Sequence, residues 1–424
     1  MTFNRREFMK WMSAGAGVTA VAGCAGTGYG STVGRVVVIG AGYGGATAAK
    51  YVRMWAPDIE VTLVERNSEF ISCPISNLVL GGSKTLADIT VGYGGLDKYG
   101  VKRVRDDAVA VDPVKREVRL ASGTTLGYDR LIVSPGIDFM YETIPGLNNA
   151  AAQERVLHSW KAGAQTVALR KQLEAMRDGG VYAIQIPKAP YRCPPGPYER
   201  ACQVAHYFKT AKPKSKVLIL DANEDVTSKK GLFMAAWNGP YKGMVEYRPN
   251  SELLDVDVKT LTAKLQFDNV KADVLNVVPP HGAGQIARQA GLITANNRWC
   301  GIDWLTMESI KVKGVHVLGD ATLSAPAMPK SGHMANQHAK VAAAAVIALI
   351  KNQPVNAQPM MVNTCYSFID DKNVVHVASV HAYDAAQKTM TVVKGAAGLS
   401  DKANELEGLY AMSWAKNIWA DMLA

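Results

Sequence analysis

The stretch RVVVIGAGYGG, residues 35–45, decides the fold of this 424-residue chain. An apolar strand runs into a glycine-rich turn, and a small-residue helix and a second strand ending before Glu65 follow. Gly40 permits the tight turn, Gly42 lets backbone N–H groups approach a diphosphate, and Gly45 lets the helix pack closely on the strand. Glu65 is placed to bind ribose hydroxyls. The stretch therefore predicts a dinucleotide-binding βαβ unit.

Two later segments indicate that the dinucleotide is FAD. YDRLIVSPG, at residues 128–136, resembles the strand and turn that follow the first half of the FAD domain in flavoproteins with two dinucleotide folds. GVHVLGD, at residues 314–320, resembles the second FAD motif of the same proteins, whose aspartate, here Asp320, binds the ribityl chain. A helix expected at residues 332–350 would point its first N–H groups toward the flavin pyrimidine ring.

The region between these FAD segments has the strand and helix rhythm of a second doubly wound domain, with strands expected at residues 181–186, 216–220 and 274–278. The turn after the first strand reads PKAPYRCPPGP, residues 187–197, and five of its eleven residues are proline. Proline lacks the N–H group that binds a diphosphate and the freedom in φ that glycine supplies. We therefore expect no NAD site there.

The predicted fold class is α/β, with two doubly wound dinucleotide-binding-type domains, as in glutathione reductase, and a small C-terminal α+β domain. The FAD domain is expected to combine residues 34–146 with residues 284–354. Residues 147–283 form the second Rossmann-like domain, and residues 355–424 form a tail that covers the flavin. In that tail the sequence predicts strands at residues 374–380 and 389–393 and a helix at residues 405–423.

Composition agrees with a globular α/β protein: 48% of the residues are hydrophobic, only 20% are charged, and 38 are glycine. The formal net charge is +10. Because the lysines and arginines are scattered along the chain, we interpret them as a solvated surface, and nucleic acid is not an expected partner.

The N-terminus carries an export signature. NRREFMK at residues 4–10 precedes a weakly apolar run of small residues, so residues 1–30 resemble a twin-arginine signal, and the expected destination is the periplasm. The sequence VAGC ending at Cys24 also resembles a lipoprotein processing site; the alternative is that Cys24 belongs to a leader cut nearby. Elsewhere no apolar stretch reaches about 20 residues, so no transmembrane segment is expected.

The chain has six cysteines, and none lies in a Cys-x-x-Cys or Cys-x-x-Cys-His arrangement. Zinc, covalent haem and any other metal site are therefore not expected in this chain. Cys202 and Cys300 have structural surroundings, the first on a helix and the second between Trp299 and Gly301.

The remaining cysteines lie in three motifs: SCP at residues 72–74, YRCPPGPYER at residues 191–200 and NTCYS at residues 363–367. Together they resemble the flavoprotein subunit of flavocytochrome c sulfide dehydrogenase, and the resemblance spans nearly the whole chain. It implies oxidation of sulfide, FAD as cofactor, and a c-type cytochrome, either a subunit or a soluble protein, as electron acceptor.

By this resemblance Cys73 forms a covalent bond to FAD. Such a bond would keep the flavin in place after export, where it cannot be replaced. The sequence departs from the family at Pro74, where the relatives have an aromatic residue. The competing interpretation of Cys73 is a buried free cysteine.

The resemblance also implies that Cys193 and Cys365 form a redox disulfide beside the flavin, with Cys365 nearer the ring. A purely structural disulfide is the alternative, since a bond closing so long a loop stabilises a fold by roughly 5 kcal/mol. Arg192 and Arg200 flank the motif and would stabilise a thiolate at Cys193. Glu199 is a candidate proton acceptor during sulfide attack, or simply a favourable partner for a helix dipole.

Two other functions fit the same sequence. A sulfide:quinone oxidoreductase shares the fold and a cysteine pair but needs a lipid-facing surface, and charged residues interrupt the apolar positions of the C-terminal helix. A non-catalytic flavin-bearing partner of a sulfur-oxidising system is the third interpretation. Trp414 lies where the relatives have a tryptophan near the active site, although core packing explains it equally well.

Overall fold

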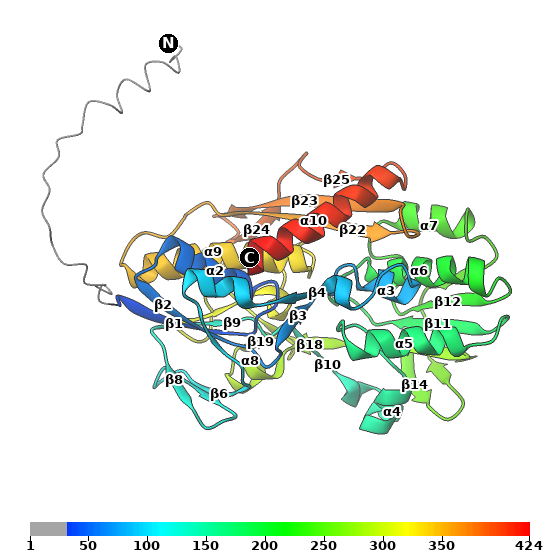
Figure 1. The fold of residues 1–424 in the computed structure, drawn as a ribbon, viewed down its shortest axis with the longest axis horizontal. Helices are drawn as coiled ribbons and strands as arrows, with labels where there is room; N and C mark the ends of the chain where they lie inside the picture. Colours follow the sequence, from blue (N-terminus) through cyan, green and yellow to red (C-terminus); the bar gives the residue numbers. More distant parts are fainter. Residues whose placement is uncertain (1–31) are drawn as a thin grey trace, which may run out of the picture. The chain divides into compact units, whose positions relative to one another are not determined.

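The computed structural model describes residues 32–424, which build three layered regions (Figure 1). The twin-arginine signal and Cys24 lie outside the described residues. Within residues 32–424 no helix is long and apolar enough to cross a membrane. The same residues contain no group of three or more histidine, cysteine or acidic side chains that could hold a metal ion.

A five-stranded parallel sheet carries the glycine-rich turn, and its order is β21-β9-β1-β2-β5. Its strands are β1 (Gly34–Ile39), β2 (Ile59–Val64), β5 (Lys102–Val104), β9 (Arg130–Val133) and β21 (Val315–Val317). Helices α2 (Gly45–Trp55) and α9 (Gly332–Ile350) pack against each other. Because β21 pairs with β9, the chain returns to this sheet after the whole inserted region.

Small antiparallel elements surround the first sheet. They are β3 (Glu69–Ile71) with β4 (Thr90–Gly92), β6 (Ala108–Asp112) with β7 (Glu117–Leu120) and β8 (Thr125–Gly127), β10 (Ile137–Phe139) with β18 (His281–Ala283), and β19 (Ile293–Ala295) with β20 (Trp299–Cys300). Helix α8 (Gln285–Gln289) contacts β6.

The second region is a four-stranded parallel sheet in the order β13-β12-β11-β17. Its strands are β11 (Val181–Ile186), β12 (Lys216–Asp221), β13 (Val245–Arg248) and β17 (Val274–Val277). Its helices are α4 (Ala150–Arg155), α5 (Ala164–Ala175), α6 (Gly196–Ala211) and α7 (Lys230–Asn238). Helix α3 (Ser76–Gly81), which follows Cys73, packs against α5 and α6. An antiparallel ribbon completes the region: β14 (Leu253–Asp257), β15 (Thr262–Leu265) and β16 (Asn269–Lys271).

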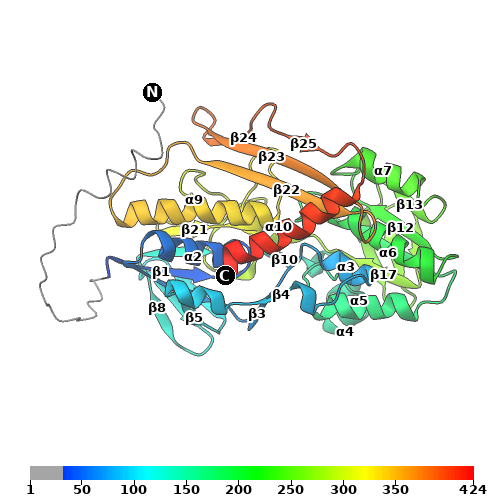
Figure 2. The ribbon, with the colours of Figure 1, turned by 45° about the horizontal axis from the view of Figure 1, so that its top comes forward.

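The tail forms an antiparallel sheet and a long helix that lie across the other two regions (Figure 2). The sheet consists of β22 (Met360–Phe368), β23 (Val374–Asp384), β24 (Thr389–Val392) and β25 (Gly398–Leu399). Strand β22 contacts both α9 and α6, so it bridges the two parallel-sheet regions. Helix α10 (Glu405–Leu423) packs on β23 and reaches α2.

The fold class expected from the sequence is confirmed. The three strands predicted in the inserted region correspond to β11, β12 and β17, and the two long helices begin and end at the expected residues, Gly332–Ile350 and Glu405–Leu423. Strand β22 was not expected, although it carries Cys365. The exact domain bounds stay predictions.

Candidate functional site

The glycine-rich turn has the geometry that a dinucleotide site needs. Gly40 has φ +89°, a left-handed conformation that favours glycine. A Cβ on Gly45 would lie 1.7 Å from the carbonyl oxygen of Gly40, so only glycine allows α2 to start this close to β1. Around Gly42, by contrast, no other described atom lies within 4 Å of where a Cβ would be, so its backbone is open to a ligand. Glu65 accepts a hydrogen bond from the Ala41 N–H at 2.8 Å.

A second part of the cradle lies where β21 ends. Among residues 32–424 nothing donates a hydrogen bond to the buried Oδ1 of Asp320. Burial raises the pKa of Asp320, against the positive charges of Arg192 and Lys330. Ser331 caps α9 by accepting a hydrogen bond from Met334 N–H. An unpaired buried acceptor, an open glycine backbone and a capped helix N-terminus fit the ribityl chain, the diphosphate and the ring of FAD.

Cys73 lies in a strained loop between β3 and α3. Ile75, two residues later, has φ 75°, which is an outlier for a β-branched residue. The Cys73 sulfur accepts hydrogen bonds from the Ala162 N–H at 3.5 Å and from Nη2 of Arg192 at 3.3 Å. The Arg192 side chain therefore contacts Cys73, and its charge also lowers the pKa of Cys193, in the direction that the sequence predicted.

Arg200 makes no hydrogen bond to Cys193, although a charge on Cys193 raises the pKa of Arg200 against the effect of burial. It is buried, and its guanidinium donates to the carbonyl oxygens of His158 and Ser159 and to the side chains of Asn77 and Asn276. Its role is to join α6 to the neighbouring loop. The sequence shows that Arg200 is close to Cys193 along the chain. It could not show which groups the guanidinium contacts, because the side chain lies on the buried face of α6.

Cys193 lies in the turn before α6 with φ 58°. The turn is fixed by two hydrogen bonds, from the Cys193 N–H to the Lys330 carbonyl at 2.8 Å and from the Gly196 N–H to the Cys193 carbonyl at 2.9 Å. A Cβ on Gly196 would lie 2.8 Å from the Cys193 sulfur. Although Cys193 is exposed, the protein atoms around its thiol raise its pKa by desolvation, and the nearby charges of Glu199 and Cys365 act in the same direction.

Cys365 lies at the centre of β22, and its sulfur accepts a hydrogen bond from Nδ2 of Asn363 at 3.3 Å. Burial raises its pKa, while Lys229 and Asn363 lower it. Because the charge of Cys365 acts on the pKa of Cys193, the fold brings these two cysteines together from the second region and the tail. All five cysteines in the described residues are free thiols in this structure, and the disulfide stays a prediction.

Glu199 lies on the first turn of α6 and is buried. Its carboxylate accepts hydrogen bonds from the Phe368 N–H and from Nδ2 of Asn77, both at 2.9 Å. Burial raises the pKa of Glu199, and those hydrogen bonds and the charge of Lys229 oppose the rise. Glu199 thus joins α6 to the end of β22 and lies close enough to both cysteines to affect the pKa of each.

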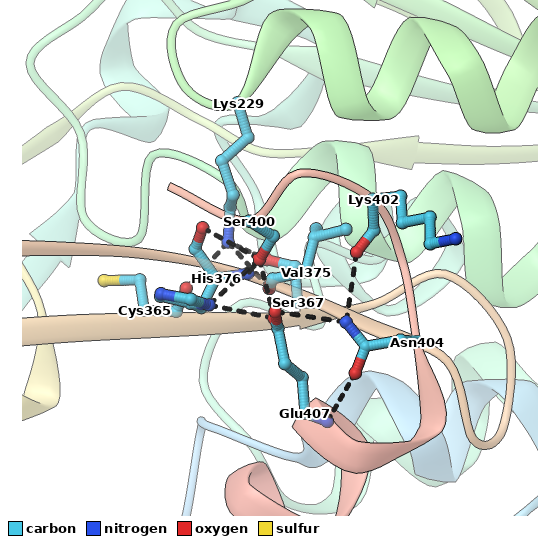
Figure 3. A network of polar contacts seen from close by, with 9 residues as sticks. All are labelled: Lys229, Cys365, Ser367, Val375, His376, Ser400, Lys402, Asn404 and Glu407. Carbon is cyan, nitrogen blue, oxygen red and sulfur yellow. Dashed lines mark hydrogen bonds and ion pairs between the residues drawn. The ribbon is translucent and has the colours of Figure 1, made fainter. Parts of the chain in front are cut away.

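Lys229 is a site residue that sequence reasoning missed. Figure 3 shows its side chain reaching from the start of α7 to the tail sheet. Its Nζ donates to the Cys365 carbonyl at 2.7 Å and to the Ser367 hydroxyl at 2.8 Å. In the sequence it is one of two adjacent lysines, 229 and 230, and no pattern distinguishes the buried one from the exposed one.

Helix α10 contacts both the FAD-domain helix α2 and the cysteine-bearing strand β22. Trp419 donates its Nε1–H to the hydroxyl of Tyr43, the aromatic residue inside the glycine-rich turn, at 3.1 Å. The ring of Trp414 lies 5.7 Å from that of His333 on α9 and 6.1 Å from that of Tyr366, the neighbour of Cys365. The tail therefore reaches both the dinucleotide turn and the cysteine pair.

Comparison with protein families gives three matches along the chain. Residues 34–174 match the pyridine nucleotide-disulphide oxidoreductase family. Residues 166–279 match the family described as sulfide dehydrogenase [flavocytochrome c] flavoprotein chain, central, and residues 357–423 match flavocytochrome c sulphide dehydrogenase, flavin-binding. The last two matches contain Cys193 and Cys365, respectively.

Individual relatives point to the same superfamily. The flavoprotein chain of a sulfide dehydrogenase [flavocytochrome c] from Chlorobaculum thiosulfatiphilum is 58% identical over 45 residues, which are 11% of this chain and 94% of that sequence. Mouse mitochondrial sulfide:quinone oxidoreductase is 24% identical over 305 residues, 68% of this chain, and the match spans only 65% of the mouse protein's length. The sulfide:quinone oxidoreductase structure from Aquifex aeolicus superimposes with a TM-score of 0.75 at 18% identity, over 92% of this chain and 91% of that one, which shows a shared fold.

The three family matches, with a site that fits FAD and a cysteine from each of two regions near the start of α9, lead to one assignment. The chain is a homologue of flavocytochrome c sulfide dehydrogenase flavoprotein chains and contains a pyridine nucleotide-disulphide oxidoreductase domain.

Proposed function

We propose that this protein is a sulfide dehydrogenase that oxidises sulfide at a Cys193–Cys365 disulfide and passes the electrons through FAD to a c-type cytochrome. The observation that supports this best is that two cysteines from distant parts of the chain lie near the start of α9: Cys193 is bonded to Lys330, and Asn363, the donor to Cys365, is bonded to Ser331. The matches to the flavocytochrome c sulfide dehydrogenase families support the substrate.

In the proposed reaction hydrosulfide attacks the sulfur of Cys193, which is the exposed member of the pair. The bond between the two cysteine sulfurs breaks, a new S–S bond forms at Cys193, and the electron pair leaves on Cys365 as a thiolate. Glu199 is placed to accept the proton when the incoming species is H₂S, because burial raises the pKa of its carboxyl and makes it a stronger base than an exposed glutamate.

Gly40, Gly42, Glu65 and Asp320 would hold FAD, and Cys73 would attach it covalently. The flavin supplies, when bound, a two-electron acceptor that releases electrons singly to a haem. Arg192 donates a hydrogen bond to the Cys73 sulfur, the atom that would form the bond to the flavin.

Intact mass under denaturing conditions tests the cofactor and the disulfide together. We expect an added FAD mass that Cys73→Ala abolishes, and a gain of two hydrogens on reduction that Cys365→Ser abolishes. Cys202→Ala is the matched control, since Cys202 is buried on α6. Loss of all flavin on denaturation of the wild type would rule out the covalent bond.

Sulfide-dependent reduction of cytochrome c tests the reaction itself. We expect Cys193→Ser and Cys365→Ser each to abolish it, and Cys202→Ala to preserve it. Wild-type protein that carries flavin but reduces no acceptor with sulfide would instead be a non-catalytic partner of a sulfur-oxidising system.

A quinone is the second candidate for the electron acceptor. The first turns of α10 expose Leu406, Leu409 and Tyr410 by 55%, 70% and 52%, an apolar patch of the kind that a lipid surface covers. Sulfide-dependent reduction of a soluble quinone that is faster than that of cytochrome c would favour this acceptor. The cytochrome acceptor requires the reverse order.

The periplasm is the proposed location, because residues 1–30 resemble a twin-arginine signal. Export of the folded protein would let FAD bind in the cytoplasm first. Replacing Arg5 and Arg6 by lysine is expected to leave the protein in the cytoplasmic fraction, and a lipid mass on Cys24 would show a membrane anchor.

A further inference from the structure

Lys229 occupies a position that is energetically unfavourable for a lysine, because the residue is buried and has a left-handed backbone conformation. It has φ 57°, a left-handed conformation, at the residue before α7, and its side chain points inward with only 6% of the residue exposed. Its Nζ donates to the carbonyl of Cys365 and the hydroxyl of Ser367, with a longer contact of 3.5 Å to the carbonyl of Val375. All three acceptors are neutral.

The buried ammonium of Lys229 forms no ion pair with a carboxylate in residues 32–424. Its neighbour Lys230 does form one, with Asp225 at 2.5 Å, on the exposed side of the same turn. An unpaired charge inside a protein costs several kcal/mol unless an opposite charge compensates it. We therefore expect that a negative charge forms next to the Lys229 ammonium at some stage of the reaction.

Four acidic groups face Lys229 from the elements packed around it: Cys365 on β22, Glu199 and Cys193 at the start of α6, and Glu407 on α10. Glu199 is already bonded to Phe368 N–H and Asn77. Glu407 is bonded to Ser400, His376 and Asn404, as Figure 3 shows.

Of the two cysteines, only Cys365 accepts a hydrogen bond from Lys229, through its backbone carbonyl. Among charged groups, Lys229 has the largest effect in lowering the pKa of Cys365. The sulfur of Cys365 has one amide donor, Asn363, and no charged donor in the described residues. Its thiolate would thus have fewer hydrogen-bond donors than either carboxylate near Lys229.

We propose that Lys229 is a positioning residue whose ammonium charge stabilises the Cys365 thiolate when the Cys193–Cys365 disulfide opens. This proposal rests on the proposed function. It adds that Lys229 favours Cys365, rather than Cys193, as the sulfur that leaves as a thiolate. Attack at Cys193 leaves the hydrosulfide proton on the outer sulfur and the electron pair on Cys365, so Lys229 transfers no proton and keeps its charge. Attack at Cys365 would place the thiolate on Cys193, which has no hydrogen bond from Lys229.

The stabilisation depends on pH in one direction. Burial lowers the pKa of Lys229 to about 8, against the opposing effect of Cys365, Glu199, Cys193 and Glu407. The ammonium is therefore present below about pH 8 and is lost as the pH rises through that value. The advantage that Lys229 gives to the thiolate must fade over the same range.

Alkylation of Cys365 tests the proposal without sulfide. The flavin-loaded protein is reduced and treated with iodoacetamide, and peptide mass spectrometry follows each cysteine. Because alkylation rate follows the thiolate fraction, we expect Lys229→Met to slow the reaction of Cys365 about tenfold near neutral pH. The difference from wild type should shrink above about pH 8.

Three variants separate charge from structure. Lys230→Met is the matched control and should react like wild type. Lys229→Gln keeps hydrogen bonds to Cys365 and Ser367 without the charge, and it should be as slow as Lys229→Met. Lys229→Arg keeps a charge and should restore much of the rate.

Wild-type alkylation of Cys365 in folded Lys229→Gln, whose near-ultraviolet spectrum serves as the folding check, would overturn the proposal. That outcome is independent of sulfide oxidation, since no sulfide is present. Conversely, alkylation of Cys365 could be slow in Lys229→Gln while the wild-type protein fails to oxidise sulfide. That result would support Lys229 as the partner of the Cys365 thiolate and reject only the proposed substrate.

Discussion

At the scale of single residues, the glycines of the dinucleotide turn have different neighbours. A methyl group on Gly45 would collide with the backbone at Gly40, whereas a methyl group on Gly42 would meet no described atom. Gly45 is therefore required by the fold itself, and Gly42 is required only when a ligand lies against it.

We expect Gly45→Ala to destabilise the protein by about 3 kcal/mol or more through overpacking. Gly42→Ala should leave the urea midpoint of the flavin-free protein nearly unchanged and yet lower the flavin bound after purification at least tenfold. Absorbance of bound flavin and urea unfolding measure the two effects. Normal flavin content in Gly42→Ala would show that the diphosphate does not approach this residue.

A second residue-scale prediction concerns the buried Lys330, whose Nζ lies 3.8 Å from the ring centre of Trp299. Burial lowers its pKa from 10.5 to about 8 in the folded state. Between these values the unfolded chain binds more protons than the folded one, so stability relative to Lys330→Met rises with pH, by about 3 kcal/mol over the whole range.

Urea unfolding of wild type and Lys330→Met at several pH values measures this difference. Lys313→Met, at an exposed lysine, is the control, and its difference in unfolding free energy from wild type should not change with pH. If the difference in unfolding free energy between wild type and Lys330→Met also did not change with pH, Lys330 would have an ordinary pKa in the folded protein.

At the scale of elements, N-terminal caps explain where two of the long helices begin. Ser331 caps α9 and Asn404 caps α10, each accepting from the N–H three residues later. Strand β22 lacked such a signal, because Asn363, Thr364 and Ser367 interrupt its apolar alternation.

Ser331 also links two elements, since its hydroxyl donates to Asn363 on β22 at 2.6 Å. We expect Ser331→Ala to lower the free energy of unfolding by about 1 kcal/mol through loss of the cap. Ser331→Asn, which retains a capping oxygen, should recover most of that loss. The readout is the urea midpoint at constant m-value, and an unchanged midpoint in Ser331→Ala would contradict the role of the cap.

At the scale of the whole molecule, the tail is bound to the second region by contacts that need no disulfide. Gln203 on α6 donates to the carbonyls of Phe368 and Asp370, at 3.1 Å and 2.8 Å, and Tyr241 donates to the carbonyl of Ile369 at 2.5 Å. A Cys193–Cys365 disulfide, if it forms as proposed, could therefore open and close without releasing the tail.

We expect Cys365→Ser to keep the radius of gyration and the proteolysis pattern of wild type, because these polar contacts remain. Gln203→Ala should loosen the tail, since it leaves buried carbonyls without donors at a cost of about 1–3 kcal/mol. Small-angle scattering and limited proteolysis distinguish the two variants. Faster cleavage of Cys365→Ser within residues 355–424 would show that the disulfide itself holds the tail.

The sequence by itself determined the features that depend on local pattern. The turn at residues 35–45 specified the dinucleotide fold, the prolines at residues 187–197 argued against a second dinucleotide, and capping residues set where α9 and α10 begin. Each of these follows from backbone geometry over a few neighbouring residues, which is why it can be read without coordinates.

Only the tertiary structure decided which side chains meet. It brought the Arg192 side chain into hydrogen-bond contact with Cys73, and it buried Lys229 beside Cys365 while Lys230 stayed exposed. These choices depend on contacts between segments that are more than 100 residues apart in the chain. Residue type and local periodicity carry no information about such contacts, because the packing of three regions around the site fixes them.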